Sequence, residues 1–293
     1  MEVFKRSVII KAQTNFIRIV SYQHLVFLRQ RQMGENRLKV LFLGDVVGKS
    51  GCDFVARHLG SIKKTYGVDA CIINGENSAE GNGITPDSAR MLFDAGADVI
   101  TTGNHVLKRK EIFPKLDEQN GIIRPANYHH SAPGAGVFVL DKLRWQLCVI
   151  NLQGQAGMEP CGNPFEKIDQ LLQELPYKNI LVDFHAEMTS EKKAMGYYLD
   201  GRVSAVLGTH THVQTADERI LPKGTAYITD AGMCGGKNSV LGVKREIIIQ
   251  KFLTNLPVRF EYDHQDMELN AVLIEIDNAS GKAQDIQRIR IEE

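Results

Sequence analysis

The sequence predicts an α/β protein in which two packed β-sheets are flanked by helices. Short apolar runs rich in β-branched residues alternate with segments of helical spacing, and a hairpin pattern occupies the middle of the chain. No internal repeat or low-complexity tract interrupts this order. The chain has 293 residues, of which 43% are hydrophobic, so it is long enough to bury a sizeable core. We expect a single domain over residues 38–293.

Strands and helices alternate in the first part of this domain. The predicted strands are 40–43, 70–73 and 98–102, and the predicted helices are 51–66 and 86–95. Thr85 followed by Pro86 marks the start of the second helix, because a capping hydroxyl before a proline is typical of helix N-termini. Alternation of this kind joins the strands by right-handed crossovers and predicts a largely parallel sheet.

The second part of the domain begins with a hairpin. Its strands are predicted at 136–140 and 145–152, separated by Asp141 and Lys142. The strands expected after the hairpin are 180–183, 203–207, 226–229, 258–262 and 268–276, and the expected helices are 194–199 and 246–253.

Residues 1–37 differ from the rest, because Lys and Arg outnumber Glu there by seven to two. No apolar stretch in this segment approaches the roughly 18 residues that a bilayer span requires, and no signal-peptide core is present. We interpret it as a basic N-terminal extension outside the fold: a presequence, an extra helix, or translation from a misassigned start upstream of Met33.

Charge and cysteine content exclude several classes of protein. The formal net charge is zero, which indicates neither a nucleic-acid groove nor a polybasic membrane surface. The five cysteines are widely spaced without a CxxC pair, so a zinc knuckle or redox motif is not expected. Cys71 and Cys148 lie in apolar strands and are predicted to be small buried side chains. A reduced, cytoplasmic protein fits this pattern.

Polar side chains follow the ends of five predicted strands. They are Asp45, Glu76, Asn77, Asn104, His105, His185, His210 and His212. Because open α/β sheets place their chemistry at the carboxyl ends of the strands, we expect these side chains to meet at one edge. A single metal ion takes three or four protein ligands, so eight donors indicate two ions about 3.5–4 Å apart that share a carboxylate.

Glu76 is the natural bridge, since its carboxylate has two oxygens and lies near the middle of the set. Two divalent ions would bring more positive charge than the carboxylates of Asp45 and Glu76 neutralise, because His and Asn ligands are uncharged. The centre would therefore ionise a bridging water near neutral pH and hold an anionic phosphate. The absence of thiolate ligands disfavours a structural zinc site, and mixed nitrogen and oxygen donors suit iron, manganese or zinc.

Each residue also has a structural interpretation. Any one of the histidines could be a hydrogen-bonded core or loop residue. Asp45 could cap the helix near Gly51, Asn77 could stabilise its own turn, and Asp230 could support the site from outside or cap a turn.

With these loops in view, the chain resembles the calcineurin-like metallophosphoesterases, and more closely their YmdB-type subfamily. The superfamily hallmarks GNH (103–105) and GxHxH (208–212) are present, with His185 between them. The common opening DxH is absent, and Glu76 replaces the usual bridging Asp. The subfamily pattern is carried by LGDVVGKSG (43–51), NGEN (74–77), TTGNHV (101–106), RPANY (124–128), DFHAE (183–187) and GTHTHVQTADERILP (208–222). The resemblance covers residues 40 to about 277.

The resemblance implies a calcineurin-like metallophosphoesterase fold and a dinuclear phosphodiesterase. One metal ion would be held by Asp45, Glu76, Asn77 and His212, and the other by Glu76, Asn104, His185 and His210. The expected cofactors are two divalent or trivalent ions, iron first, with manganese or zinc as alternatives. His105 would be the proton donor for the leaving oxygen, while a bridging hydroxide attacks phosphorus. The expected substrate is a small-molecule phosphodiester, with 2′,3′-cyclic nucleotides first, and the expected protein is a cytoplasmic homo-oligomer without nucleic-acid or membrane partners.

Three other functions stay open. The first is a phosphomonoesterase or nucleotidase on the same metal pair, with a regulatory role beside it. The second is a metal-dependent amide hydrolase, which would place its HxH on an early strand. The third is a regulator that holds metal only for structure. Three segments depart from the subfamily pattern and would alter substrate preference if they line the pocket: 129–130, 155–157 and 234–236.

Overall fold

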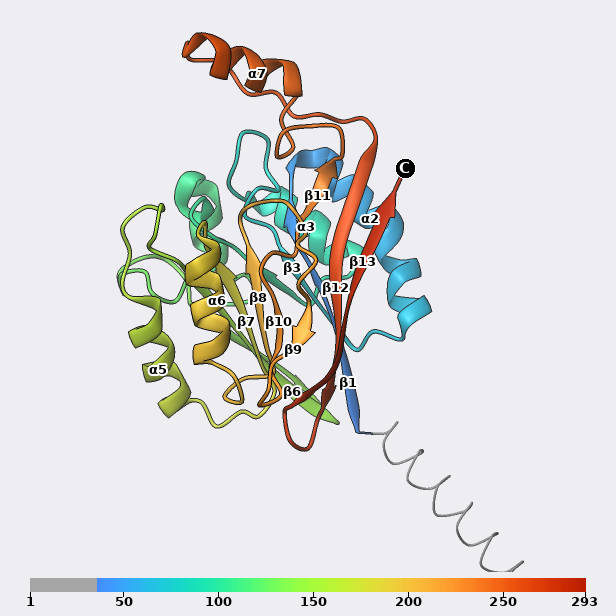
Figure 1. Ribbon diagram of the computed structural model, residues 1–293, viewed down its shortest axis with the longest axis vertical. Helices are drawn as coiled ribbons and strands as arrows, with labels where there is room; N and C mark the ends of the chain where they lie inside the picture. The colour runs from blue at the N-terminus through green and yellow to red at the C-terminus, as the bar shows by residue number, and fades with distance from the viewer. Residues whose placement is uncertain (1–35) are drawn as a thin grey trace, which may run out of the picture. The chain divides into compact units, whose positions relative to one another are not determined.

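The computed structural model describes residues 36–293, of which Leu38–Glu293 form one compact unit. The basic extension predicted at 1–37 lies outside the described residues except for its last two. Two β-sheets pack face to face, and helices cover their outer faces (Figure 1). None of the helices within 36–293 combines the length and apolarity that a bilayer crossing requires.

The first sheet has the strand order β2-β11-β12-β1-β3-β4, and β13 pairs with β12. Its strands are β1 (Arg37–Leu43), β2 (Asp45–Val46), β3 (Ala70–Asn74), β4 (Val99–Thr101), β11 (Met233–Gly236), β12 (Met267–Asp277) and β13 (Ala283–Glu292). β1, β3 and β4 are parallel, as the crossovers predict. β11, β12 and β13 pair antiparallel, so the sheet is mixed rather than largely parallel.

The second sheet has the order β5-β6-β7-β8-β10-β9. Its strands are β5 (Val137–Lys142), β6 (Trp145–Gln153), β7 (Ile180–His185), β8 (Ala205–Thr209), β9 (Arg219–Ile220) and β10 (Ala226–Ile228). The four central strands are parallel, and β5 and β9 close the two edges in antiparallel orientation.

The helices form the outer layers. Those longer than one turn are α2 (Gly48–Tyr66), α3 (Pro86–Ala95), α4 (Phe113–Asp117), α5 (Pro164–Glu174), α6 (Thr189–Tyr198) and α7 (Arg245–Thr254), with short 3₁₀ turns at Val106–Lys108 and Lys110–Ile112. α2 and α3 contribute to the apolar core outside the first sheet. α5 and α6 contribute to the core outside the second sheet. α7 stands beyond the ends of the strands (Figure 1).

A third apolar core fills the space between the sheets. Phe42 of β1 and Ile72 of β3 meet Leu181 of β7 there, and all three side chains are fully buried. Strands buried on both faces need continuous apolar sequence, which explains why these runs are apolar without alternation. The packing aligns the strand ends of both sheets and so positions the site.

The structure corrects several sequence-based boundaries. Residues 258–262 do not form a strand, and only Tyr262 makes an isolated bridge, to Val243. The hairpin turns at 143–144, because Asp141 and Lys142 still pair with Gln146 and Trp145. The sequence analysis did not predict α4, α5, β2, β9, β11 and β13. β13 was missed because charged and polar residues make up most of its sequence and mask the few apolar residues that face the core.

Candidate metal centre

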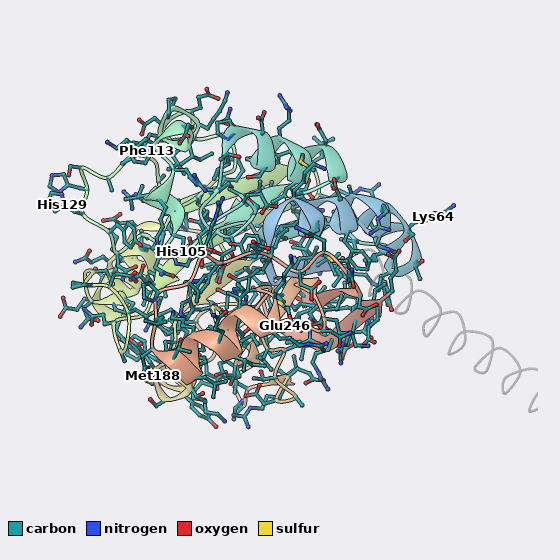
Figure 2. All side chains as sticks on the ribbon, turned by 90° about the horizontal axis from the view of Figure 1, so that it is seen from above. Lys64, His105, Phe113, His129, Met188 and Glu246 are labelled. Carbon is teal, nitrogen blue, oxygen red and sulfur yellow. The ribbon has the colours of Figure 1, made fainter. Side chains whose placement is uncertain are left out.

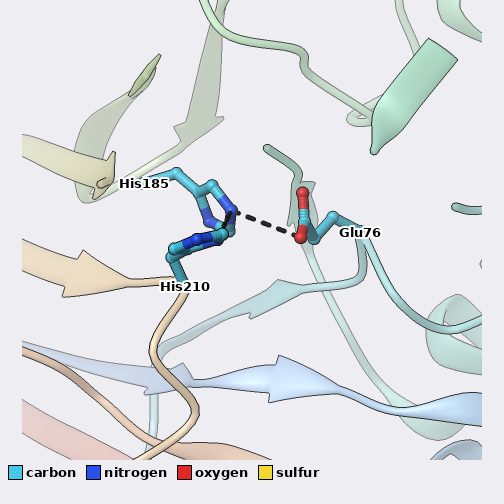
Figure 3. A group of neighbouring side chains, drawn as sticks. All are labelled: Glu76, His185 and His210. Atoms are coloured by element: carbon cyan, nitrogen blue, oxygen red, sulfur yellow. Dashed lines mark hydrogen bonds and ion pairs between the residues drawn. The ribbon is translucent and has the colours of Figure 1, made fainter. Parts of the chain in front are cut away.

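The predicted donors converge at one edge, where strands of both sheets end. The first sheet supplies Asp45, Glu76, Asn77, Asn104 and His105, from β2 and the loops after β3 and β4; the second supplies His185, His210 and His212, from the end of β7 and the loop after β8. Figure 3 shows three of them, Glu76, His185 and His210, whose ligand atoms all lie within 4.8 Å of one another. Side chains separated by more than a hundred residues in the sequence thus meet in space.

Glu76 lies at the centre of the group and is fully buried. Its Oε1 lies 3.2 Å from Nε2 of His185, and its Oε2 accepts a hydrogen bond of 3.1 Å from the backbone N–H of His105. Burial by itself raises the pKa of Glu76, but the charges and hydrogen bonds of His185 and His105 outweigh it and hold this pKa well below its ordinary value. Glu76 is therefore a carboxylate.

His185 directs one ring nitrogen into the group and the other out of it. Nδ1 lies 2.8 Å from Oγ1 of Thr209, and this hydroxyl donates to Asp183 at 2.7 Å. The hydroxyl hydrogen is thereby used, so Nδ1–H of His185 is the donor to Thr209, and Nε2 is the ring nitrogen that faces the group. Burial lowers the pKa of His185, but Glu76 and Asp45 raise it further, to about 9.

A cation fits the space in front of Nε2 of His185. This atom lies 3.2 Å from the Glu76 carboxylate, 3.1 Å from Oδ1 of Asn104 and 3.0 Å from Nδ1 of His210. One ring proton cannot serve three acceptors at once, and buried acceptors left facing one another are costly. A metal ion would satisfy all four atoms and would take the place of that proton.

His210 and His212 stand on a strained loop. Both have positive φ, 104° and 63°, in the region that residues with a Cβ rarely adopt. Nε2 of His210 lies 3.1 Å from the Glu187 carboxylate, and Nδ1 of His212 lies 3.1 Å from the Leu241 carbonyl oxygen. Each ring therefore has an outer partner that orients it, as in metal-ligating histidines.

Asp45 faces His212 across the second half of the group. Its Oδ1 lies 3.6 Å from Nε2 of His212, and its Oδ2 accepts the backbone N–H of His210 at 3.2 Å. Asp45 does not cap α2, because the residue before that helix is Val47 and makes no side-chain cap. The capping alternative for Asp45 is therefore wrong.

The amide of Asn77 is turned away from the orientation that a ligand would need. Its Nδ2 lies against Glu76 at 2.9 Å and Asp45 at 3.4 Å, whereas its Oδ1 lies 2.8 Å from Nδ1 of His105. A metal ligand would be Oδ1, so a half-turn of the amide is required. The ligand role of Asn77 stays a prediction.

Asn104 and His105 contact different partners. Oδ1 of Asn104 faces His185, while the ring of His105 lies over Glu76, with its Nδ1 at 3.1 Å from the carboxylate. Gly103 before them permits this approach, because a Cβ there would lie 2.3 Å from Glu76 Oε2. The GNH motif thus needs its glycine for space.

A buried ion pair supports the histidine loop and was not predicted. Lys192 of α6 and Asp230 are both buried, and Nζ lies 2.7 Å from Oδ2. Asp230 also accepts hydrogen bonds from the backbone N–H and the hydroxyl of Thr211, and from the backbone N–H of Gly232. From the sequence alone, Asp230 could either support the site from outside or cap a turn. Lys192 was missed because a lysine in a helix normally faces solvent.

A cavity of about 370 Å³ opens in front of the centre. The donors in its lining are Glu76, Asn77, His105, His210 and His212, and residues of the 240–262 segment complete the lining. The three segments that depart from the subfamily pattern do not line it. The lining of this cavity therefore gives no support to the idea that these three segments alter substrate preference.

The comparisons with known proteins agree with this geometry. The model of a family described as YmdB-like protein matches residues 41–289. The chain is 50% identical over 258 residues to the 2′,3′-cyclic-nucleotide 2′-phosphodiesterase of Bacillus subtilis, covering 87% of this chain and 97% of that protein.

Solved structures are similar as well. A novel phosphatase from Mycoplasma pneumoniae is 37% identical, with a TM-score of 0.84 over 88% of this chain and 94% of that one. The NAD nucleotidase of Haemophilus influenzae is 11% identical, with a TM-score of 0.51 over 87% of this chain and 56% of that one, and so shares the fold. The expected fold, a mixed α/β arrangement of two sheets as in calcineurin-like metallophosphoesterases, is confirmed.

Proposed function

We propose that this chain, which belongs to the YmdB-like family, hydrolyses 2′,3′-cyclic nucleotides with the help of two metal ions. That the chain is a phosphoesterase follows from the family and its relatives. We propose the substrate, the pair of ions and the proton donor. The observation that carries it is the convergence of oxygen and nitrogen donors around Glu76.

Two sets of residues would hold the ions, with Glu76 common to both. The first set is Asp45, Glu76, Asn77 and His212, and the second is Glu76, Asn104, His185 and His210. When bound, the two ions would activate a water molecule and neutralise charge on the phosphate. We propose iron as the native metal, since mixed carboxylate, amide and imidazole donors suit it, with manganese and zinc as the alternatives.

His105 is the proposed proton donor. Its Nδ1 is engaged by Asn77 at 2.8 Å, and its ring lines the cavity. Nε2 is then the atom that can carry a proton to a departing oxygen. In the reaction, the bond from phosphorus to O2′ breaks, a bond from water oxygen to phosphorus forms, and O2′ receives the proton from His105, which leaves a 3′-phosphate.

The outer partners of the histidine rings keep this arrangement in place, and of these Asp183 and Thr209 are fully buried. Thr209 with Asp183 orients His185, Glu187 orients His210, and the Leu241 carbonyl orients His212. Fixed orientation matters because donors aimed in advance need no reorganisation during the reaction.

Product analysis of the metal-loaded full chain tests the proposal. With 2′,3′-cyclic AMP we expect adenosine 3′-phosphate as the product and no further hydrolysis of that monoester. A phosphomonoesterase or nucleotidase would instead hydrolyse adenosine 3′-phosphate or 5′-phosphate and leave the cyclic diester intact. That result would overturn the proposed substrate class.

We also propose a cytoplasmic homo-oligomer. The four cysteines in the two sheets and α2 are free and buried, which suits a reducing compartment. Measuring the mass of the purified protein in solution tests the oligomer.

A further inference from the structure

The segment 237–266 leaves the first sheet after β11 and returns to it at β12. Figure 1 shows its helix α7 standing beyond the ends of the strands, and Figure 2 looks onto this end, where Glu246 marks α7 and His105 marks the loop after β4. The segment carries an unusual number of exposed large apolar side chains. They are Leu241, Ile249, Phe252, Leu253, Leu256 and Phe260.

The base of this segment is anchored rather than loose. Val243, Ile248 and Tyr262 are buried and pack with Val47 and Met233 in a separate apolar cluster. The hydroxyl of Tyr262 also donates to the side chain of Asn82. The segment therefore holds a defined position over the site.

Its inner side forms one wall of the cavity that contains the metal donors. Phe252 and Phe260 line that wall together with Lys251, and His105 and His212 belong to the metal-donor wall of the same cavity. The hydrogen bond from His212 Nδ1 to the Leu241 carbonyl oxygen joins the two walls directly. One cavity thus combines a site for phosphate with an apolar aromatic surface that the metal chemistry does not use.

We propose that Phe252 and Phe260 form a nucleobase subsite, on which the base of the substrate stacks while its cyclic phosphate lies at the metal donors. The inference rests on the proposed function and adds the residues that recognise the base. Aromatic rings stack on any planar base, because every base has a π-face. Nζ of Lys251 lies 4.9 Å from the centroid of the Phe260 ring, a cation–π distance that keeps a positive charge on this wall near an anionic substrate.

Two substrates separate base recognition from chemistry. The first is 2′,3′-cyclic AMP, and the second is methyl β-ribofuranoside 2,3-cyclic phosphate, which has the same cyclic diester and no base. We expect Phe252→Ala and Phe260→Ala to lower kcat/KM for the first about tenfold to a hundredfold, the range that loss of one stacking ring gives. Turnover of the base-free substrate should change less than twofold.

Leu253→Ala is the matched control. Leu253 follows Phe252 on α7 and is as exposed, but it does not line the cavity. It should leave both substrates unaffected. Binding of adenosine 3′-phosphate, measured by calorimetry, gives a second readout that needs no turnover, and Phe252→Ala should weaken it by a similar factor.

Other results would overturn the subsite. Equal losses on both substrates would mean that the two rings act on the chemistry or on folding. Equal losses in Phe252→Ala and Leu253→Ala, together with a changed mass in solution, would mean that α7 packs against a second copy of this chain. If the wild type hydrolyses neither substrate, the proposed function is wrong. The binding of adenosine 3′-phosphate to the wild type and to Phe252→Ala then tests the subsite by itself.

Discussion

The two walls of the cavity are built in opposite ways. At the metal-donor edge, Glu76, His185 and Asp45 are fully buried and each makes several polar contacts. On the facing segment, Phe252 is 76% exposed and contacts solvent over most of its ring. Glu76 and Phe252 line the same cavity, yet the first is buried among polar contacts and the second is largely exposed.

This difference indicates a division of tasks. Groups that take part in bond making need fixed positions, and the packed sheets with their outer partners supply them. Groups that only select a substrate can stand on a segment that connects two strands, because surface connections tolerate variation without disturbing the fold. The effects of substitutions on the two walls should therefore differ both in the property that changes and in the size of the change.

The largest effect is expected from His185→Ala. Its Nε2 faces Glu76, Asn104 and His210, so the variant should lose metal and most of the several kcal/mol that metal ions contribute to the transition state, about 10⁴-fold in kcat/KM. Activity assays with elemental analysis of the same sample measure both. Full metal content with full activity would remove His185 from the centre.

His105→Asn should cost less, because it removes the proton donor and leaves the ligands. We expect a loss of about 10²- to 10³-fold in kcat for cyclic AMP with unchanged metal content. A substrate with a p-nitrophenolate leaving group, which needs little protonation, should be much less affected. Equal losses with good and poor leaving groups would argue against a proton-transfer role.

Lys192→Met tests the support beneath the histidine loop. It leaves Asp230 buried without its ammonium partner, so we expect about 3 kcal/mol of lost stability and roughly tenfold weaker metal binding. Urea unfolding and metal titration measure the two quantities. Lys193→Met, one position along the same helix and less buried, is the control and should change neither.

The smallest effect is expected from Phe252→Ala, when the free energy of unfolding is measured. Because this ring is 76% exposed, the free energy of unfolding should change by no more than about 0.5 kcal/mol. Phe184 of β7 is fully buried, and Phe184→Ala should cost about 3–5 kcal/mol. Similar losses for both variants in urea unfolding would show that α7 is packed as tightly as the sheets and would remove the contrast.

The sequence predicted those helices and strands whose apolar residues form a regular or continuous pattern. Buried strands such as β1 and β3 are continuous apolar runs, and their order predicts which loops meet at one edge. β13 and α5 were missed because their exposed faces interrupt the apolar pattern. The strand expected at 258–262 was wrong, because Tyr262 alone pairs there, in an isolated bridge to Val243, while Phe260 is exposed at the cavity.

The same distinction holds for the site. Donors placed at strand ends, such as His185 and Glu76, could be found because their position follows from topology. Lys192 and Glu187 act through a neighbouring loop in space, and no local pattern in the sequence links them to it. The positive φ of His210 and His212 likewise has no local signal, because those residues disfavour it.

The metal stoichiometry of the purified full chain tests the central claim most directly. After loading with iron or manganese and removal of free ions, elemental analysis should give two ions per chain, and Glu76→Gln should lower that content because the shared carboxylate is lost. A wild type that binds no metal, or a Glu76→Gln variant that still binds two ions, would contradict the claim that donors from both sheets hold a metal pair around Glu76.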